Sequence, residues 1–500
     1  MLHQSGWAQD GHIHLVVVTN FSSTASRTMR RHSTITFLIL CTVITLYGPI
    51  ESARSYSLQY TNSAGSVGLK WPSDTITIAF STSLNSPSPN IKAGSDVVGA
   101  ARRALARWSV AAKIKFVEVT RSEQLIGNDQ VNLITIAPGN SFTDAAQPGR
   151  TRLTFNTVTG DIADADIAIN PTLFASDGGP GFSTDGTPGT YDLEAVITHE
   201  VGHLLGLDHS GVVGSIMQPR QGMNNSSQAA MGQIPRRMLS FDDRAGVRAV
   251  YGSASGAGAI VGSVTYASGG HAAFGAHVWA EDVTTGRVGA SAVALANGRY
   301  RIGGLLPGRY RVVAEYLNEP IALEEIGSRK GAFSGLRAAI EPFTTVEAAA
   351  GVNVSIGAST SLNIIVPNNN RPPLNATSLG MDGQLSTVAV RLVPGRVATI
   401  LIGGANVHQT GVGGISVTSP FFTVVPSSVT FLTFGQTQVL RFDVSVAGST
   451  PPGEYSIRLQ SDTNEIDYIV GALTVDSPDN GISLNWSDIM GVASLETNQR

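Results

Sequence analysis

The chain is short of cysteine and of charged residues. Its 500 residues include one cysteine, Cys41, and only 14% of them are Asp, Glu, Lys or Arg. A single cysteine excludes a disulfide-built scaffold, a zinc site made of cysteines and an iron–sulfur cluster. The 33 basic and 37 acidic residues give a formal charge of −4. This balance offers no electrostatic reason to expect nucleic acid as a partner.

Hydrophobic residues are plentiful, at 42% of the chain. That share can fill buried cores, and together with the low charge it is unlike the composition of a disordered protein. At about 150 residues per domain, the length predicts about three domains. The chain is also rich in turn-forming residues, with 55 glycines and 23 prolines, which suits β-rich domains with many turns.

One apolar run lies near the N-terminus, at residues 34–47, directly after Arg30, Arg31 and two polar residues. Basic residues followed by a short apolar run are typical of a secretory signal. The run is shorter than the roughly 20 residues that a membrane-spanning helix needs.

We therefore expect residues 1–53 to contain a signal peptide, with translation starting at Met29 and cleavage near Ala53. Cleavage would remove Cys41 and exclude a cysteine nucleophile. The expected product is secreted, either free or held at the cell surface, and has no stable membrane span.

Residues 66–252 mix strand and helix patterns. Residues 75–80 alternate between apolar and polar side chains, which predicts a strand. Asp96 or Ser95 can begin a helix whose apolar stripe ends at Trp108. Further strands are expected at residues 113–119, 131–136, 150–155 and 163–170. A strand, a helix and a strand in this order indicate a crossover connection and a largely parallel sheet.

The remaining chain loses the helical pattern. Short alternating strands separated by turns fill residues 257–367 and again residues 372–476. Such strings predict two β-sandwich domains. The junctions near residues 252–258 and 367–373 have the glycine or proline content of linkers. Residues 477–500 have weak patterning, and we expect a tail there.

One motif carries chemistry: residues 199–209 read HEVGHLLGLDH. His199 and His203 are four residues apart, so on a helix both imidazoles point from one face and can hold a metal. Gly206 falls where the chain must leave the helix, a position that favours a left-handed residue. The turn can bring His209 to the same metal. Three neutral imidazoles leave one coordination position open, as a catalytic zinc requires.

Glu200 follows the first histidine and is expected to face the open position without binding the metal. A carboxylate there can take a proton from a water that attacks a carbonyl. The alternative is a surface helix with chance histidines. Outside the N-terminal segment, however, three of only six histidines lie within this motif.

The motif resembles that of the metzincin metallopeptidases, which place a methionine turn beneath the metal. Met217 in the stretch SIMQP at residues 215–219 matches that turn. Ser210, the Trp-Pro pair at residues 71–72 and the stretch at residues 239–252 indicate the matrixin branch. The resemblance covers residues 66–252. It implies an α/β (α+β) catalytic domain with a mixed, mostly parallel sheet and an active-site helix.

The resemblance also implies where a substrate binds. An extended peptide would add to the sheet along an edge strand formed by Arg152, Leu153, Thr154 and Phe155. Residues 218–223 would wall the pocket for the residue after the scissile bond. Matrixins usually carry a tyrosine there, whereas this chain has Gln221.

Two interpretations of four aspartates stay open. Asp161, Asp164, Asp166 and Asp177 could hold calcium, which takes oxygen ligands, or they could be solvated carboxylates of a polar loop. No histidine lies between Ser33 and His199, so a second, structural zinc would find no histidine ligands in that part.

The C-terminal half carries looser resemblances. Residues 259–316 resemble the carboxypeptidase regulatory-like, transthyretin-like sandwich, through glycine and proline turns and the repeated Gly-Arg-Tyr at residues 298–300 and 308–310. His271 and His277 are interpreted there as satisfied surface histidines, with a ligand role as the alternative. The last region resembles bacterial immunoglobulin-like sandwiches through the stretch PPGEY at residues 451–455.

Together these patterns predict a secreted zinc endopeptidase that acts as a monomer on protein or peptide substrates and does not bind nucleic acid. One alternative is a cell-surface adhesin whose peptidase-like domain binds without cleaving, although an intact Glu200 argues against it. Another is a zinc hydrolase of a different substrate class. The roles of the two sandwiches stay open, because a fold alone does not define a function.

Overall fold

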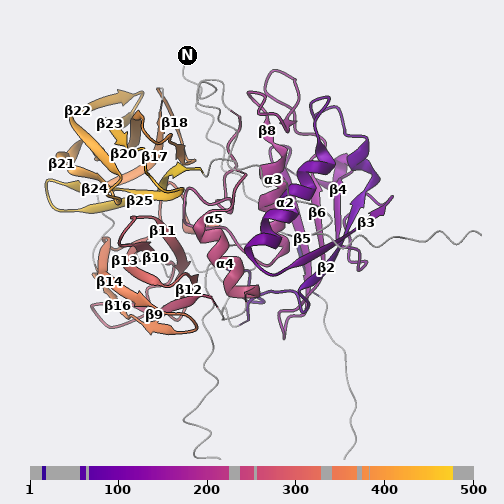
Figure 1. Ribbon diagram of the computed structural model, residues 1–500, viewed down its shortest axis with the longest axis horizontal. Helices are drawn as coiled ribbons and strands as arrows, with labels where there is room; N and C mark the ends of the chain where they lie inside the picture. The colour runs from indigo at the N-terminus through magenta and orange to yellow at the C-terminus, as the bar shows by residue number, and fades with distance from the viewer. Residues whose placement is uncertain are drawn as a thin grey trace, which may run out of the picture.

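The structure is a computed structural model that describes residues 14–17, 57–62, 67–142, 144–224, 237–252, 256–327, 341–368, 374–381 and 383–476. The predicted signal and the predicted tail lie outside these residues, except for the short strand β1 (His14–Val17). Figure 1 shows a mixed helical and stranded body beside two stacked β bodies. We refer to them as the first region (57–252), the second region (256–368) and the third region (374–476).

The first region is built on a six-stranded sheet with the order β1-β5-β6-β4-β2-β3. Its strands after β1 are β2 (Thr75–Ser81), β3 (Lys115–Arg121), β4 (Leu133–Ile136), β5 (Gly149–Phe155) and β6 (Ile162–Ile169). All neighbours pair in parallel except β5 and β6. These strands coincide closely with the ranges that side-chain alternation predicts, because one face of each strand must be buried.

Two helices pack together against this sheet, α2 (Val97–Ala111) and α3 (Leu193–Leu204). Each begins at an aspartate, Asp96 or Asp192, whose carboxylate accepts a hydrogen bond from a backbone N–H of the first turn. Trp108 of α2 is fully buried, and its indole N–H donates to the carbonyl oxygen of Thr198 at 2.8 Å. Every residue of α3 is buried, so the helix that carries the histidine motif is the core of this region.

The second region pairs its strands into two sheets, with the orders β11-β10-β13-β14 and β12-β9-β15, and β16 pairs with β9. The bounds are β9 (Gly258–Tyr266), β10 (Ala276–Asp282), β11 (Val288–Val293), β12 (Arg299–Leu305), β13 (Gly308–Tyr316), β14 (Val346–Val354), β15 (Ser359–Ser361) and β16 (Ile364–Val366). The one-turn helix α5 (Leu323–Ile326) follows β13.

The third region also has two sheets, with the orders β18-β17-β20-β23-β22 and β19-β25-β24-β21. Its strands are β17 (Asn375–Met381), β18 (Gln384–Ser386), β19 (Val390–Arg391), β20 (Val397–Ala405), β21 (Thr410–Val417), β22 (Phe422–Phe434), β23 (Thr437–Val446), β24 (Gly453–Ser461) and β25 (Ile466–Val475). The C-terminal half is thus rich in β-sheet. Its division into two domains, with the predicted bounds, stays a prediction.

The helix α4 (Phe241–Tyr251) joins the three regions. The Asp242 carboxylate accepts a hydrogen bond from the backbone N–H of Ser291 in the second region at 2.6 Å. The first N–H of the helix, on Phe241, donates to Glu454 of the third region at 2.9 Å. Both contacts therefore hold the β regions to the N-terminal end of α4.

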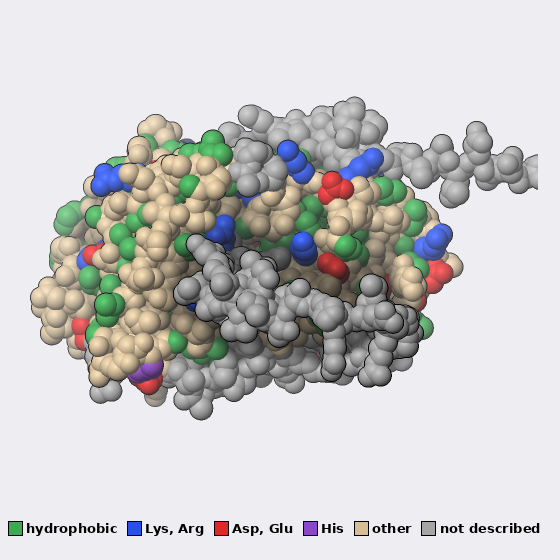
Figure 2. Space-filling model, turned by 90° about the horizontal axis from the view of Figure 1, so that it is seen from below, with side chains coloured by type: hydrophobic (Ala, Val, Ile, Leu, Met, Phe, Trp, Pro, Cys, Tyr) green, Lys and Arg blue, Asp and Glu red, His purple; other side chains and the backbone are tan. Residues whose placement is uncertain are grey.

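The face shown in Figure 2 does not carry charges of one sign alone. The described Lys, Arg, Asp and Glu side chains on it are scattered among polar and hydrophobic ones. In the part of the chain that the structure describes, no helix is long and apolar enough to cross a membrane.

Candidate metal centre

Three histidines of the motif meet at the end of α3. His199 and His203 lie on the helix, and Gly206 then adopts φ +86°, the left-handed conformation predicted for it. A Cβ atom on that glycine would lie 2.5 Å from the carbonyl oxygen of Leu69, so only glycine fits. The turn brings His209 back towards the other two rings.

The Nε2 atom of His203 lies 3.1 Å from that of His199 and 3.2 Å from that of His209. The candidate ligand atoms of all three residues lie within 4.8 Å of one another. Among the described residues, this is the only group of three or more His, Cys, Asp or Glu side chains close enough to share a metal ion. All three rings are buried, so they converge on one point away from bulk water.

The opposite nitrogen of each ring faces a backbone carbonyl oxygen. His199 Nδ1 lies 2.8 Å from the oxygen of Ile216, and His203 Nδ1 lies 2.9 Å from that of Leu207. His209 Nδ1 lies 2.5 Å from the oxygen of Glu325. A carbonyl can only accept, so each Nδ1 carries the proton and each Nε2 keeps its lone pair for a metal.

Burial keeps these imidazoles neutral. It lowers the pKa of His199 to about 4 and, with repulsion from His199, that of His209 to about 3. The pKa of His203 falls well below its usual value for the same reasons. Neutral imidazole nitrogen is the donor that zinc prefers alongside thiolate. The three side chains therefore fit a divalent cation such as zinc.

Glu200 lies against strand β5. Its carboxylate Oε2 accepts a hydrogen bond from the hydroxyl of Thr151 at 2.6 Å, and its Oε1 would lie 3.1 Å from a Cβ atom on Gly149. Burial raises the pKa of Glu200 to about 7. A carboxyl group with such a pKa can exchange protons near neutral pH. Sequence analysis missed Thr151, although a buried hydroxyl on a strand that faces the motif helix was a signal for it.

Met217 is fully buried, and its carbonyl oxygen accepts a hydrogen bond from the N–H of Ser210 at 2.9 Å. The turn before it is fixed by Asp243 of α4. That carboxylate accepts from the Ser215 hydroxyl at 2.5 Å and from the Ile216 N–H at 3.0 Å. Asp243 therefore caps the start of α4 and also holds the methionine turn against the histidines, a role that sequence analysis missed.

The predicted edge strand is not at the edge of the sheet. Arg152, Leu153, Thr154 and Phe155 pair with β6 on one side and with β1 on the other, in the register Arg152↔His14 to Phe155↔Val17. An unpaired strand edge is a template for any extended segment. In this structure β1, which lies before the expected start at Met29, takes that place, and the substrate role of Arg152 to Phe155 stays a prediction.

The structure does not gather the four candidate calcium ligands into one group. Asp161 accepts from the Thr159 hydroxyl, and Asp177 accepts from the Gly179 N–H, so both support local turns. Asp166 accepts from the backbone N–H groups of Gly127 and Leu133. Burial raises the pKa of Asp164 to about 6 and that of Asp166 to about 7. Asp161 and Asp177 therefore agree with the polar-loop interpretation, whereas Asp164 and Asp166 are buried carboxylates of β6, which neither interpretation described.

Two further residues differ from expectation. His277 is a fully buried histidine, not a surface one. Its Nδ1 lies 3.1 Å from Glu315, and its ring stacks on Trp279. The first region covers it, which sequence patterning of the second region alone cannot show. The side-chain amide group of Gln221 lies 2.9 Å from Nδ1 of His199, a contact that sequence analysis did not predict.

Comparison with known families gives this geometry a context. Residues 70–252 match the family model described as Peptidase_M10: Matrixin. This part of the chain is a matrixin domain. Metalloendoproteinase 1-MMP of Arabidopsis thaliana is 29% identical over 187 residues, 37% of this chain and 44% of the relative. Matrilysin of Rattus norvegicus is 29% identical over 192 residues, 37% of this chain and 59% of the relative.

The matches are partial. The chain covers 44%, 11% and 53% of the lengths of three curated relatives: the Arabidopsis enzyme, the hatching enzyme of Paracentrotus lividus and metalloendoproteinase 1 of Glycine max. Among solved structures, the major pilin subunit BcpA of Bacillus cereus covers 42% of this chain and 66% of its own at 15% identity, with a TM-score of 0.13. A TM-score this low carries no argument about fold or function.

Proposed function

We propose that the chain is a secreted zinc endopeptidase that hydrolyses peptide bonds in extracellular proteins. The matrixin match supports the class of reaction, and the convergence of three Nε2 atoms carries the assignment of the site. In this proposal His199, His203 and His209 are the zinc ligands. Glu200 is the general base and acid, and Met217 supports the site as the methionine of the turn.

Each side chain has a separate task. The three imidazoles hold the ion, which when bound polarises a carbonyl group and makes a nearby water more acidic. Glu200 takes a proton from the attacking water and passes it to the nitrogen of the leaving amine. Thr151 orients the Glu200 carboxylate through its hydroxyl at 2.6 Å. The buried setting strengthens each of these interactions, because water does not screen them.

The substrate is proposed to be an extended stretch of protein. It would pair with β5 along Arg152 to Phe155, the place that β1 occupies in this structure. The segment from Gln218 to Met223 would form the wall of the pocket for the residue after the scissile bond, with Gln221 where matrixins usually carry a tyrosine. The expected signal at residues 34–47 supports secretion, and we propose a monomer.

The alternative of a non-cleaving adhesin makes a different prediction for Glu200. In the proposed enzyme, Glu200→Ala keeps zinc at full stoichiometry and lowers the hydrolysis of a denatured protein by about 10²–10⁴-fold. Glu123→Ala, which removes an exposed carboxylate, is the matched control and leaves hydrolysis unchanged. Undiminished cleavage by Glu200→Ala would end the assignment. Zinc binding without any cleavage by the unmodified chain would favour the adhesin or a hydrolase of other substrates.

A further inference from the structure

The segment from Leu317 to Gly327 belongs to the second region by sequence but packs on the metal centre. Its apolar side chains, Leu317, Ile321, Leu323 and Ile326, are buried. They fall in the same hydrophobic cluster as Ile216 and Met217 of the matrixin domain. This cluster also runs through the first and third regions, so the segment is part of the apolar packing between the regions.

One residue of this segment, Glu325, makes two separate contacts with the site. Its backbone oxygen accepts the Nδ1 proton of His209 at 2.5 Å. Its carboxylate forms an ion pair with Arg220 at 2.8 Å, and both side chains are largely buried, with 8% and 17% exposed. Arg220 lies in the proposed wall of the substrate pocket. It also donates to the backbone oxygen of Pro320.

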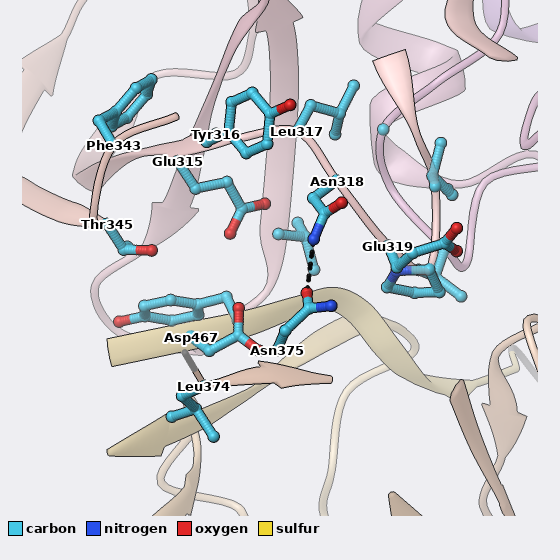
Figure 3. Close-up of a pocket in the computed structure, with 16 residues that line it drawn as sticks. Glu315, Tyr316, Leu317, Asn318, Glu319, Phe343, Thr345, Leu374, Asn375 and Asp467 are labelled. Atoms are coloured by element: carbon cyan, nitrogen blue, oxygen red, sulfur yellow. Dashed lines mark hydrogen bonds between the residues drawn. The ribbon is translucent and has the colours of Figure 1, made fainter. Parts of the chain in front are cut away.

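The segment is fixed from the far side as well. The amide of Asn318 donates to Asn375 of the third region at 2.6 Å. Figure 3 shows this bond at a small pocket lined by residues of all three regions, with Glu315, Tyr316 and Glu319 on the same stretch of chain. The pocket contains none of the motif histidines. The segment is therefore held at Asn318 by the third region and at Glu325 by the metal centre.

The supports of the three histidines differ in origin. The carbonyl groups that face His199 and His203 belong to Ile216 and Leu207, within the matrixin domain. The carbonyl that faces His209 belongs to Glu325, 116 residues further along the chain. The third imidazole therefore depends on a different part of the protein for its tautomer and orientation.

We propose that Glu325 is a positioning residue of the metal centre, so that the second region completes the zinc site of the matrixin domain. The proposal rests on the function proposed above. Its carbonyl orients His209, and its ion pair with Arg220 keeps that carbonyl in place and fixes the pocket wall. By this account the second region is more than a spacer.

Glu325→Gln tests the proposal, because it keeps the shape of the side chain and removes its charge. Loss of the ion pair loosens α5 and the carbonyl that faces His209. Substitution of such outer partners typically weakens metal affinity by about 10–100-fold. Glu324→Gln is the matched control: it is the same substitution one residue earlier, on an exposed side chain.

The experiment measures zinc affinity of the full chain by competition with a chelator, and the visible spectrum of the Co²⁺-loaded protein. We expect Glu325→Gln and Arg220→Gln each to weaken zinc binding at least tenfold and to shift the Co²⁺ bands. The double variant should lose less affinity than the sum of the two single losses, since both substitutions remove the same ion pair. Glu324→Gln should match the unmodified protein.

Metal-free melting temperatures separate positioning from general destabilisation. If Glu325→Gln does not fold, Arg220→Gln and its conservative partner Arg220→Lys carry the test, with partial recovery expected in the lysine variant. Zinc affinity and Co²⁺ spectra that are equal in Glu325→Gln and Glu324→Gln would overturn the positioning role alone. Failure of the unmodified chain to bind zinc would instead overturn the proposed function.

Discussion

The sulfur of Met217 lies 2.3 Å from the position that a Cβ atom would take on Gly202. The ring of Trp108 lies 2.9 Å from the same point. The glycine between the two helical histidines therefore admits the methionine turn and the α2 tryptophan on one face of α3. Gly202 and Met217 therefore pack directly against each other.

This contact predicts the effect of Gly202→Ala. In an ordinary helix interior the change would stabilise the protein by about 1 kcal/mol. Here the methyl group collides with two buried side chains, so we expect a loss of about 1–3 kcal/mol, measured by denaturant unfolding. Gly448→Ala, at a position with open space around the added Cβ, is the control. A stabilised Gly202→Ala protein would show that Met217 does not lie against the helix.

A buried ion-pair cluster predicts a large stability effect of one carboxylate. Glu194 of α3 has no exposed side-chain surface and lies 2.7 Å from Arg103 and 2.6 Å from Arg107 of α2. Because Glu194→Gln removes the carboxylate that pairs with Arg107 and leaves Arg103 with only Asp96, we expect a loss of about 3–5 kcal/mol. The half-exposed pair of Arg102 and Glu118 provides the comparison.

Glu118→Gln breaks that more exposed pair, which joins α2 to β3. It should cost no more than about 1 kcal/mol, because solvent screens the charges. Both variants are compared by urea unfolding under identical conditions. Equal losses in the two variants would contradict the assignment of Glu194 as the buried anchor between the helices.

The pKa shifts predict two separate acid limits. The pKa of Glu200 is raised to about 7, and its base form is lost as the pH falls through that value or, with a cation bound nearby, through a lower one. The pKa values of His199 and His209 are lowered to about 4 and about 3, so protons displace the metal only in stronger acid. We therefore predict that activity falls in mild acid, with protonation of Glu200 as the first cause.

Zinc content and peptide hydrolysis measured on the same samples from about pH 8 down to about pH 5 test this order. We expect hydrolysis to fall while zinc stays bound. Simultaneous loss of zinc and activity would show that histidine protonation sets the limit. A flat activity profile across the range would contradict the role of Glu200.

The local parts of the site could be predicted from sequence. The spacing of His199 and His203 fixes their common face on a helix, and a glycine at 206 ends that helix by its own backbone preference. Alternation of side chains likewise located strands β2 to β6 of the first sheet. Both kinds of pattern depend only on residues close together in the sequence. The family resemblance then supplied Met217.

Contacts between distant segments could not be predicted. The carbonyl of Glu325 has no side-chain signature, and its approach to His209 depends on how the second region packs. The burial of His277 and the hydrogen bond from Ser215 to Asp243 also depend on packing between segments that are distant in the sequence. The pairing of β1 with β5 was missed because any extended segment can satisfy a strand edge.

The central claim is that three imidazoles hold one zinc ion. X-ray absorption at the zinc edge of the zinc-loaded full chain measures this directly. The account predicts one equivalent of zinc with three histidine nitrogens at about 2.0–2.1 Å and one oxygen as the fourth ligand. A spectrum dominated by carboxylate oxygens, or a protein that retains no zinc, would contradict it.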